Sequence, residues 1–149
     1  MEKLTIRPIV ASDTEMVLDL MKALAIHHNH LEYLKIDCET FIRYAFCENP
    51  IIGMHVAELD SEIVGYVSYT RNFSIWAGSF YLNIDDVFVR PEFRSLGVGG
   101  KMMQWVQSEK SGEINRIRWE VEKDNHRAIQ FYENLGAILW IKGICNWSI

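Results

Sequence analysis

The sequence has few cysteines, no excess of basic residues and no long apolar run. Its 149 residues include three cysteines, Cys38, Cys47 and Cys145, an odd number without CxxC spacing, which predicts reduced thiols. Lys and Arg number 15 against 20 Asp and Glu, a net charge of −5 without a basic tail, so we expect no nucleic-acid partner. No apolar stretch approaches the ~20 residues of a membrane-spanning helix, so we expect no membrane association.

No repeat, linker or low-complexity segment interrupts the chain, and the first ten residues contain no apolar core of a secretory signal. We therefore expect a cytoplasmic protein. A content of 49% hydrophobic and 23% charged residues is typical of a soluble globular protein, and the length predicts one domain over residues 1–149. Aromatic residues make up 12% of the chain, so some rings are expected in a pocket or a subunit interface.

Hydrophobic periodicity predicts an α/β domain with the order β-α-α-β-β-β-α-β-α-β-β. Helices are expected to open with the capping-box spacing of residues 12–15, at Cys38, near Val98, and after the cap formed by Asp124 and Asn125. Strands are expected at residues 3–8, 54–59, 63–70, 80–89, 114–121, 138–141 and 144–147, with a long loop over residues 71–79. This order predicts a mixed, mostly antiparallel, twisted sheet with helices on both faces, and a ligand at the carboxyl ends of the strands.

Residues 84–103, IDDVFVRPEFRSLGVGGKMM, predict a strand, a glycine-rich loop and a helix in succession. Gly97, Gly99 and Gly100 would leave backbone N–H groups unobstructed at the start of that helix, where the helix dipole favours an anion. Arg94 adds a positive charge just before them. We expect a phosphorylated cofactor to bind here, and the alternative is a plain tight turn that caps the helix.

Asp85 and Asp86 lie on the strand just before this loop and are candidate bases. Adjacent residues of a strand face opposite sides of the sheet, so the two carboxylates are not expected in one pocket. The pattern alone does not choose between them, and both could instead be structural or solvated. If Asp85 is partly buried, its pKa should rise toward the range that is useful for a base.

Three further features carry possible chemistry. The cluster His27, His28 and His30 contains a common zinc ligand, but the sequence has neither an HExxH motif nor a Cys/His pair, so no metal is expected. These histidines could line an acceptor pocket or form a polar helix end. Trp76 could cover a ligand or pack on a neighbouring element, and Glu120 could hold a cationic acceptor or lie on a solvated strand face.

Two separate motifs give the chain a resemblance to the GNAT superfamily of N-acetyltransferases. Residues 94–99, RSLGVG, fit its acetyl-CoA motif (R/Q)xxGxG/A, and residues 125–137, NHRAIQFYENLGA, are similar to its second signature, NxxAxxFYxxxGF. The order and gap match the family, and the resemblance covers nearly the whole chain from TIRP onward. IDDVFVRPEFRSLGVG and the Trp76-Ala-Gly78 segment most resemble the diamine (spermidine/spermine-type) and thialysine acetyltransferases.

The chain departs from these patterns at three positions. Ser95 replaces the usual first glycine of the loop, Asp85 stands where the subgroup has Glu, and Ala137 follows Gly136 where many members have Phe. The first change should leave pyrophosphate binding intact, because the two glycines nearest the helix remain. The second shortens the expected base by one methylene, so the resemblance does not determine which amine is the acceptor.

The resemblance implies a GNAT fold and an acetyl-CoA-dependent enzyme in which an amine attacks the thioester directly. It implies Asp85 as the base, acting through a water, and Tyr132 as the general acid or as a hydrogen-bond donor, although Tyr132 could also be a core aromatic. Asn125 would contact the pantetheine or cap its helix. Cofactor contacts are expected from Val87, Phe88, Val89, Arg94, Ser95, Leu96, Gly97, Val98, Gly99, Gly100, Asn125, Arg127, Ala128 and Tyr132. Acceptor contacts are expected from Asp85, Asp86, Trp76, Glu120 and His28.

The implied acceptor is a primary amine of a small molecule: a polyamine, a diamine or a lysine-like amino acid. An aminoglycoside or a peptide amine is the alternative within the class, and a non-catalytic acyl-CoA-binding module is the alternative outside it. The resemblance also implies a homodimer, with the C-terminal strands as the candidate interface.

Overall fold

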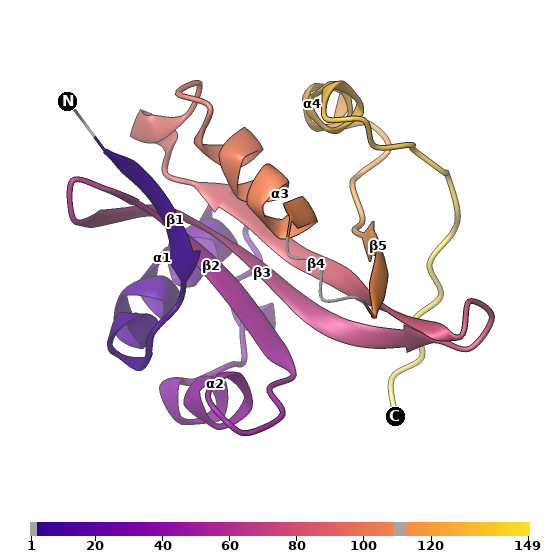
Figure 1. Cartoon of the computed structure of the whole chain (residues 1–149), viewed down its shortest axis with the longest axis horizontal. Coiled ribbons are helices and arrows are strands. Elements are labelled where there is room, and N and C mark those ends of the chain that lie inside the picture. Colours follow the sequence, from indigo (N-terminus) through magenta and orange to yellow (C-terminus); the bar gives the residue numbers. More distant parts are fainter. Residues whose placement is uncertain (1–2, 109–112) are drawn as a thin grey trace. The chain divides into compact units, whose positions relative to one another are not determined.

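The computed structural model describes residues 3–108 and 113–149 and contains a five-stranded sheet. The chain divides into two compact units, Met1–Trp119 and Glu120–Ile149, and the whole sheet belongs to the first (Figure 1). The single domain expected over residues 1–149 therefore stays a prediction. No helix in the described part of the chain is long and apolar enough to cross a membrane.

The sheet has the strand order β1-β2-β3-β4-β5, in which all neighbours are antiparallel except β4 and β5, which are parallel. The strands are β1 (Leu4–Pro8), β2 (Ile52–Leu59), β3 (Glu62–Ser74), β4 (Ser79–Val89) and β5 (Ile114–Arg118). The expected mixed, mostly antiparallel sheet is confirmed. The long central strands β3 and β4 carry most of the candidate site.

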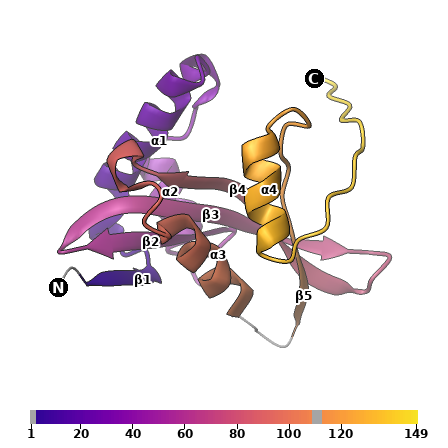
Figure 2. The same ribbon diagram turned by 90° about the horizontal axis from the view of Figure 1, so that it is seen from above.

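Helices cover both faces of the sheet, and Figure 2 shows α1 and α3 on opposite sides of it. The α-helices are α1 (Thr14–His27), α2 (Cys38–Ala45), α3 (Val98–Ser108) and, in the second unit, α4 (His126–Asn134). The described residues also form three short 3-10 turns: η1 (Ala11–Asp13), η2 (Leu31–Tyr33) and η3 (Pro91–Phe93). The two faces of β3 and β4 therefore have different surroundings, which decides what each side chain of the site contacts.

The larger core lies between α1, α2 and one face of the sheet. Its buried members come from one apolar stripe of each helix and from alternate strand residues, and they include Val17, Leu20, Phe41, Val56, Tyr66 and Phe88. On the opposite face α3 buries Met102. Gly65 on β3 has no room for a side chain, because an added β-carbon would lie 2.6 Å from the Phe88 carbonyl oxygen of β4.

The start of α1 and the structure of residues 71–79 differ from the prediction. α1 begins at Thr14, not at Ser12, because Ala11–Asp13 forms a 3-10 turn in which the Val10 N–H donates to the Asp13 carboxylate at 2.9 Å. The long loop expected over residues 71–79 is mostly strand, because Phe73 pairs with Phe80 across the hairpin and their ring centroids lie 5.0 Å apart.

The C-terminal part of the chain also differs. β5 ends at Arg118, so the expected strand does not continue to residue 121. The two strands expected at residues 138–141 and 144–147 do not form, and the described residues after α4 contain neither helix nor strand. The side chains of Trp140 and Trp147 in this segment are exposed. Apolar composition alone does not make a strand, because a strand needs a ladder of backbone hydrogen bonds to a partner.

Candidate functional site

The loop between β4 and α3 has the open backbone that an anion site needs. Gly97 has a φ of +77°, and nothing lies within 4 Å of the β-carbon position of either Gly97 or Gly100. The Lys101 N–H donates to the Gly97 carbonyl at 3.1 Å. The N–H groups of Val98, Gly99 and Gly100, which precede this bond, have no acceptor within the helix. These groups can bind a phosphate at the positive end of the helix dipole.

Arg94 is held beside this loop by its side chain. Its Nε donates to the carbonyl oxygen of Val89 at 2.9 Å, and the residue is exposed. Because this bond uses only Nε, the two Nη groups can form charge-assisted hydrogen bonds to an anion. The next residue, Ser95, has a φ of +67°, in the left-handed region that favours glycine. The serine at this position is therefore strained, and the exposed Leu96 completes the loop.

β4 leaves half of one edge unpaired within the described residues of the first unit. β5 pairs with β4 only at Phe80, Leu82 and Asn83, so the two strands part beyond Asn83 (Figure 1). Residues Ile84 to Val89 consequently have a neighbour in β3 but none in β5. An extended ligand could bind to such an edge as an added strand.

The direction of the backbone groups on this edge follows from one hydrogen bond. The Arg90 N–H donates to the Val64 carbonyl of β3 at 2.9 Å. Because directions alternate along a strand, Phe88 also directs its backbone toward β3, whereas Val87 and Val89 direct theirs toward the unpaired edge. Val87 and Val89 can therefore contact a cofactor through backbone groups. Phe88 cannot do so in this way, and its side chain is part of the core.

A β-bulge interrupts β4 at the two aspartates. The register of β3 against β4 shifts between Ser68 and Tyr69, and Asp85 is the residue of β4 that has no opposite residue in this ladder. A bulge of this kind inserts one extra residue and re-aims the side chains beside it.

The bulge places both carboxylates on the face of β4 that α1 covers. Asp86 is opposite Ser68 and Asn83 is opposite Thr70, and Ser68 and Thr70 share one face of β3. The Asn83 side-chain amide donates to Asp85 Oδ1 at 3.1 Å, so Asp85 lies on the same face. The expectation that the two carboxylates face opposite sides is therefore wrong, because it assumed an unbroken strand.

The surroundings raise the pKa of both aspartates above the ordinary range. Asp85 is exposed as a residue, yet desolvation of its carboxylate raises its pKa, and the hydrogen bond from Asn83 partly offsets this. Burial raises the pKa of Asp86, the charge of Asp85 raises it further, and His28 and Tyr66 lower it. A carboxylate with a raised pKa is a better proton acceptor at neutral pH.

The histidine cluster ends α1. His28 is the C-cap residue of the helix and is exposed, and it is close enough to Asp86 to act on it electrostatically. The centroids of the His27 and His28 rings lie 5.3 Å apart, and those of His30 and Tyr33 lie 5.6 Å apart. Within residues 3–108 and 113–149, no group of three His, Cys, Asp or Glu side chains could hold a metal ion.

Trp76 lies at the tip of the β3–β4 hairpin and is fully exposed, with a relative accessibility of 101%. Ser79 and Asp85 are six positions apart on an extended strand, a span of ~20 Å. Trp76 is therefore far from the two carboxylates of its own chain.

In the second unit, the second motif forms α4. Asn125 is the N-cap residue, and its side-chain oxygen accepts a hydrogen bond from the Ala128 N–H at 3.2 Å. Tyr132 is half-buried, its ring centroid lies 5.2 Å from that of Phe131, and burial raises its pKa. Gly136 follows the end of the helix with a φ of +95°, in the left-handed region that favours glycine.

Two expected site residues of this unit are exposed. Arg127 lies in the first turn of α4. Glu120 lies outside β5, which ends at Arg118, so the strand face expected to present it does not exist.

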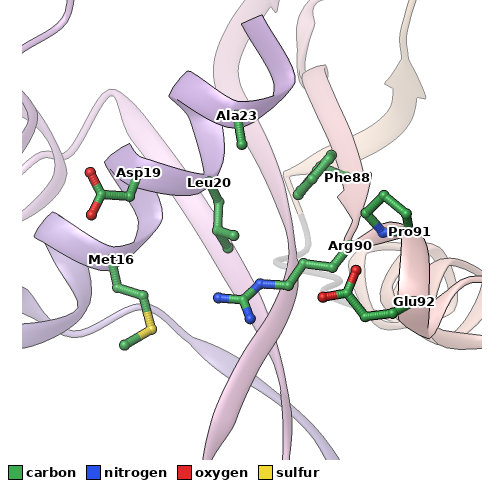
Figure 3. A pocket seen from close by; sticks show the side chains of 8 residues that line it. All are labelled: Met16, Asp19, Leu20, Ala23, Phe88, Arg90, Pro91 and Glu92. Atoms are coloured by element: carbon green, nitrogen blue, oxygen red, sulfur yellow. The ribbon is translucent and has the colours of Figure 1, made fainter. Parts of the chain in front are cut away.

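A pocket with a volume of about 410 Å³ lies between α1 and the end of β4 (Figure 3). It is lined by Met16, Asp19, Leu20, Ala23, Phe88, Arg90, Pro91 and Glu92. Arg90 also forms an ion pair with Glu62. Of the lining residues, the sequence singled out Phe88 alone, because the pocket depends on how α1 crosses the sheet.

Tyr66 on β3 is a candidate site residue that lies outside both sequence motifs. It lies in the core beneath Asp86 and acts on the pKa of that carboxylate. The available signal was one hydroxyl within the otherwise apolar stretch of residues 63–67.

The sequence is similar to those of known acetyltransferases. A family model described as Acetyltransferase (GNAT) family matches residues 18–137. The chain is 30% identical over 147 residues to a thialysine N-epsilon-acetyltransferase of Sus scrofa, which covers 92% of this chain and 85% of that protein. It is 26% identical over 146 residues to a spermidine/spermine N(1)-acetyltransferase-like protein 1 of Homo sapiens, covering 93% of this chain and 21% of that protein.

The fold is also found among solved structures. An aminoglycoside acetyltransferase from an uncultured soil metagenomic sample, determined in complex with sisomicin, matches with a TM-score of 0.80 and 16% identity. The match covers 98% of this chain and 95% of that one. At this identity the likeness concerns the fold alone.

Proposed function

Because the chain belongs to the Acetyltransferase (GNAT) family, and is an N-acetyltransferase like its named relatives, we propose that it transfers the acetyl group of acetyl-CoA to a primary amine of a small molecule. The acceptor class is a diamine, a polyamine or a lysine-like amino acid, as the names of the thialysine and spermidine/spermine relatives suggest. Residues 1–149 would act as one catalytic domain. The observation that carries the proposal is the unpaired edge of β4, with the glycine-rich loop at one end and two carboxylates at the other.

The first unit offers a contact for each part of the cofactor. Arg94 and the N–H groups of Val98, Gly99 and Gly100 would bind the pyrophosphate, and the open space at the glycines leaves room for it. Backbone groups of Val87 and Val89 would bind the extended pantetheine arm. Asp85 and Val89 are four positions apart on the strand, or ~13 Å, so phosphate and thioester would lie at opposite ends of this edge. Acetyl-CoA supplies the activated acyl thioester.

The two carboxylates suit a cationic acceptor. An alkyl amine is protonated at neutral pH and must lose a proton before its nitrogen can attack the thioester carbonyl. Asp85, whose pKa is raised, would take this proton through a water, and Asp86 would hold the ammonium group. The nitrogen–carbon bond then forms as the carbon–sulfur bond breaks, and the second proton lost by the nitrogen passes to the departing thiolate. A backbone N–H of Val87 would polarise the carbonyl oxygen.

Tyr132 is proposed to interact with the departing thiolate. Burial raises the pKa of its phenol, so the hydroxyl stays protonated at neutral pH and is a weak acid. Its role would therefore be mainly to donate a hydrogen bond to the sulfur. Asn125 would support this residue indirectly, since it caps the helix that carries Tyr132.

We propose that the active form is a homodimer in the cytoplasm. Ile75 and Trp76 at the hairpin tip and Trp140 and Trp147 after α4 are all highly exposed, and exposed apolar groups of this kind favour association. The free thiols of the three cysteines are compatible with a reducing compartment. Sedimentation of the purified chain would give its mass in solution.

A panel of amines tests the proposed reaction. The purified chain is incubated with acetyl-CoA and with thialysine, lysine, putrescine, spermidine, sisomicin or a peptide with a free N-terminus, and thiol release and acetylated product are measured. We expect the highest kcat/KM with a diamine, a polyamine or thialysine. A preference for sisomicin or for the peptide would show that the acceptor is an aminoglycoside or a peptide amine and not the proposed class. Binding of acetyl-CoA without acetylation of any amine would instead indicate a non-catalytic module.

A further inference from the structure

Tyr66 has a buried hydroxyl that packing does not explain. Its exposed fraction is 0%, and among the residues that the structure describes its hydroxyl has no hydrogen-bond partner of normal geometry. The ring packs against Phe88, with centroids 5.8 Å apart, inside the core formed with α1 and α2. A phenylalanine would fill the same space without the cost of burying a hydroxyl. Packing in the core therefore does not explain why this residue is a tyrosine and not a phenylalanine.

The polar group that faces this hydroxyl is the carboxylate of Asp86. Tyr66 is opposite Phe88, and Asp86 is two residues before Phe88, so Tyr66 and Asp86 are diagonal neighbours on one face of the sheet. Burial raises the pKa of Tyr66, and the charge of Asp86 raises it further. The hydroxyl in turn lowers the pKa of Asp86. The two groups therefore interact, although the hydroxyl makes no hydrogen bond of normal distance and angle.

Two more titratable groups act on Asp86. Asp85, its neighbour on β4, disfavours the charged form of Asp86, whereas His28 at the end of α1 favours it. An ammonium group bound between the carboxylates of Asp85 and Asp86 would remove their repulsion. Asp86 would then be fully ionised and would need an oriented donor on its buried side. Tyr66 is the donor on that side.

We propose that Tyr66 is a positioning residue for acetyl transfer: when the acceptor ammonium binds, the Tyr66 hydroxyl donates a hydrogen bond to Asp86 and turns that carboxylate toward the amine. This inference rests on the proposed function and divides the work between the two aspartates. Asp86, oriented by Tyr66, determines how well the amine binds, and Asp85 accepts the proton. Loss of the hydroxyl should therefore weaken amine binding more than it slows turnover.

The test compares two tyrosine-to-phenylalanine changes on the same strand. Tyr66→Phe removes the hydroxyl that faces Asp86. Tyr69→Phe is the matched control on the opposite face of β3, where the hydroxyl lies 3.1 Å from His55 Nδ1. With spermidine as acceptor, we expect Tyr66→Phe to raise the amine KM about 5-fold, the loss expected for one hydrogen bond, while kcat and the acetyl-CoA KM change less than about 2-fold. Tyr69→Phe should leave the amine KM unchanged and lower Tm.

The pH profile separates positioning from packing. Removing the hydroxyl removes an interaction that lowers the pKa of Asp86, so this carboxylate becomes protonated at a higher pH. The acid limb of kcat/KM for the amine should move to higher pH in Tyr66→Phe and should not move in Tyr69→Phe. Tm of Tyr66→Phe should change little, because the lost interaction with Asp86 offsets the gain from removing a buried hydroxyl that lacks a normal hydrogen bond.

A double-mutant cycle gives an independent result. If Tyr66 acts through Asp86, adding Tyr66→Phe to Asp86→Asn should change the amine KM less than about 2-fold. Additive effects of the two substitutions on the amine KM would overturn the inference. So would an active Tyr66→Phe enzyme whose amine KM and acid limb are unchanged. A Tyr66→Phe variant with a lower Tm and no kinetic change would overturn it as well. A chain that acetylates no amine of the panel would refute the proposed function instead.

Discussion

The hydroxyl oxygen of Tyr69 lies 3.1 Å from Nδ1 of His55, and the imidazole centroid lies 4.0 Å from that of Trp105 on α3. His55 is only 3% exposed, and burial lowers its pKa to about 4. The neutral imidazole is therefore the form that fits between the sheet and α3.

His55 should make the stability of the fold depend on pH. Its pKa is 6.5 in the absence of burial and about 4 in the folded chain, so the unfolded state binds the proton more tightly. The stability that neutral His55 contributes is fully present above pH 6.5 and is lost as the pH falls toward 4. We expect His55 to lower the free energy of unfolding by about 2 kcal/mol between pH 7.5 and pH 5. Urea unfolding at both pH values should show that the free energy of unfolding falls less in His55→Phe than in the unchanged chain.

An exposed histidine provides the control for this experiment. His30→Phe should keep the pH dependence of the unchanged chain, because His30 is exposed. Equal pH dependence in His55→Phe and the unchanged chain would show that another group is responsible.

Asp85→Asn should nearly abolish turnover. The amide keeps the shape of the side chain and cannot accept the amine proton, so we expect kcat to fall ~100-fold or more while the acetyl-CoA KM is kept. Because the pKa of Asp85 is raised, the acid limb of the unchanged enzyme should lie above the ordinary range of an aspartate, and the variant should lose this limb. Steady-state kinetics from pH 5 to 9 would measure both.

Asp60→Asn, in the turn between β2 and β3, is the matched control and should leave the kinetics unchanged. Normal turnover in Asp85→Asn would exclude Asp85 as the base.

Gly97→Ala should weaken acetyl-CoA binding. The residue has a φ of +77°, and the space at its β-carbon is open. An added methyl would strain the backbone by ~1 kcal/mol and would enter the space proposed for the pyrophosphate. Calorimetric titration should show a Kd for acetyl-CoA that rises about 10-fold.

Gly78→Ala separates strain from contact with the cofactor. Gly78 has a φ of +61° and the same open space, but it lies at the hairpin tip. Gly78→Ala should lower Tm by a similar amount and keep the Kd. If both variants bind acetyl-CoA normally, the loop is not the pyrophosphate site.

Ser95→Gly should stabilise the chain. Ser95 adopts a φ of +67°, which costs a serine about 1 kcal/mol relative to glycine, although glycine also gains entropy in the unfolded chain. We expect a net gain of roughly 0.5 kcal/mol in urea unfolding and no loss of acetyl-CoA affinity. A destabilised variant would mean that the serine hydroxyl makes a compensating interaction.

Arg94→Lys should not preserve cofactor binding, although it preserves the charge. The lysine lacks the Nε that donates to the Val89 carbonyl and the planar fork that binds phosphate oxygens. We expect the acetyl-CoA KM to rise about 10-fold at low salt. Arg43→Lys on α2, whose partner is Glu39 at 2.7 Å, is the surface control and should change nothing. An unchanged KM in Arg94→Lys would place the pyrophosphate elsewhere.

Features that depend on nearby residues could be predicted from the sequence. The apolar spacing of Val17, Leu20 and Leu24 predicted α1, and the glycines after Arg94 predicted a loop at a helix N-terminus. Asn125 as the cap of α4 followed from the same local rules. In each case the interacting groups are a few positions apart in the sequence.

Features that depend on pairing between strands could not be predicted. The bulge at Asp85 comes from the register of β3 against β4, and simple alternation therefore put Asp85 and Asp86 on opposite faces. Pairing of Phe73 with Phe80 likewise turned an expected loop into strand. The role of Tyr66 also depends on this register, because a diagonal neighbour is invisible in one linear sequence.

The bulge also restricts which changes in chain length β4 can accept. Deleting Asp85 would remove the bulge without moving any other residue to the other face, because Ile84 and Asp86 are already opposite the adjacent residues Tyr69 and Ser68. Deleting another residue of β4 while the bulge stays would shift one side of the ladder by one position, and a shift before the bulge would exchange the faces of buried Leu82 and Ile84 with that of Asn83. Insertions and deletions should therefore be tolerated in the turn at residues 75–78 and, apart from loss of Asp85, not between Ser79 and Val89. In this strand the number of residues is constrained more tightly than their identity.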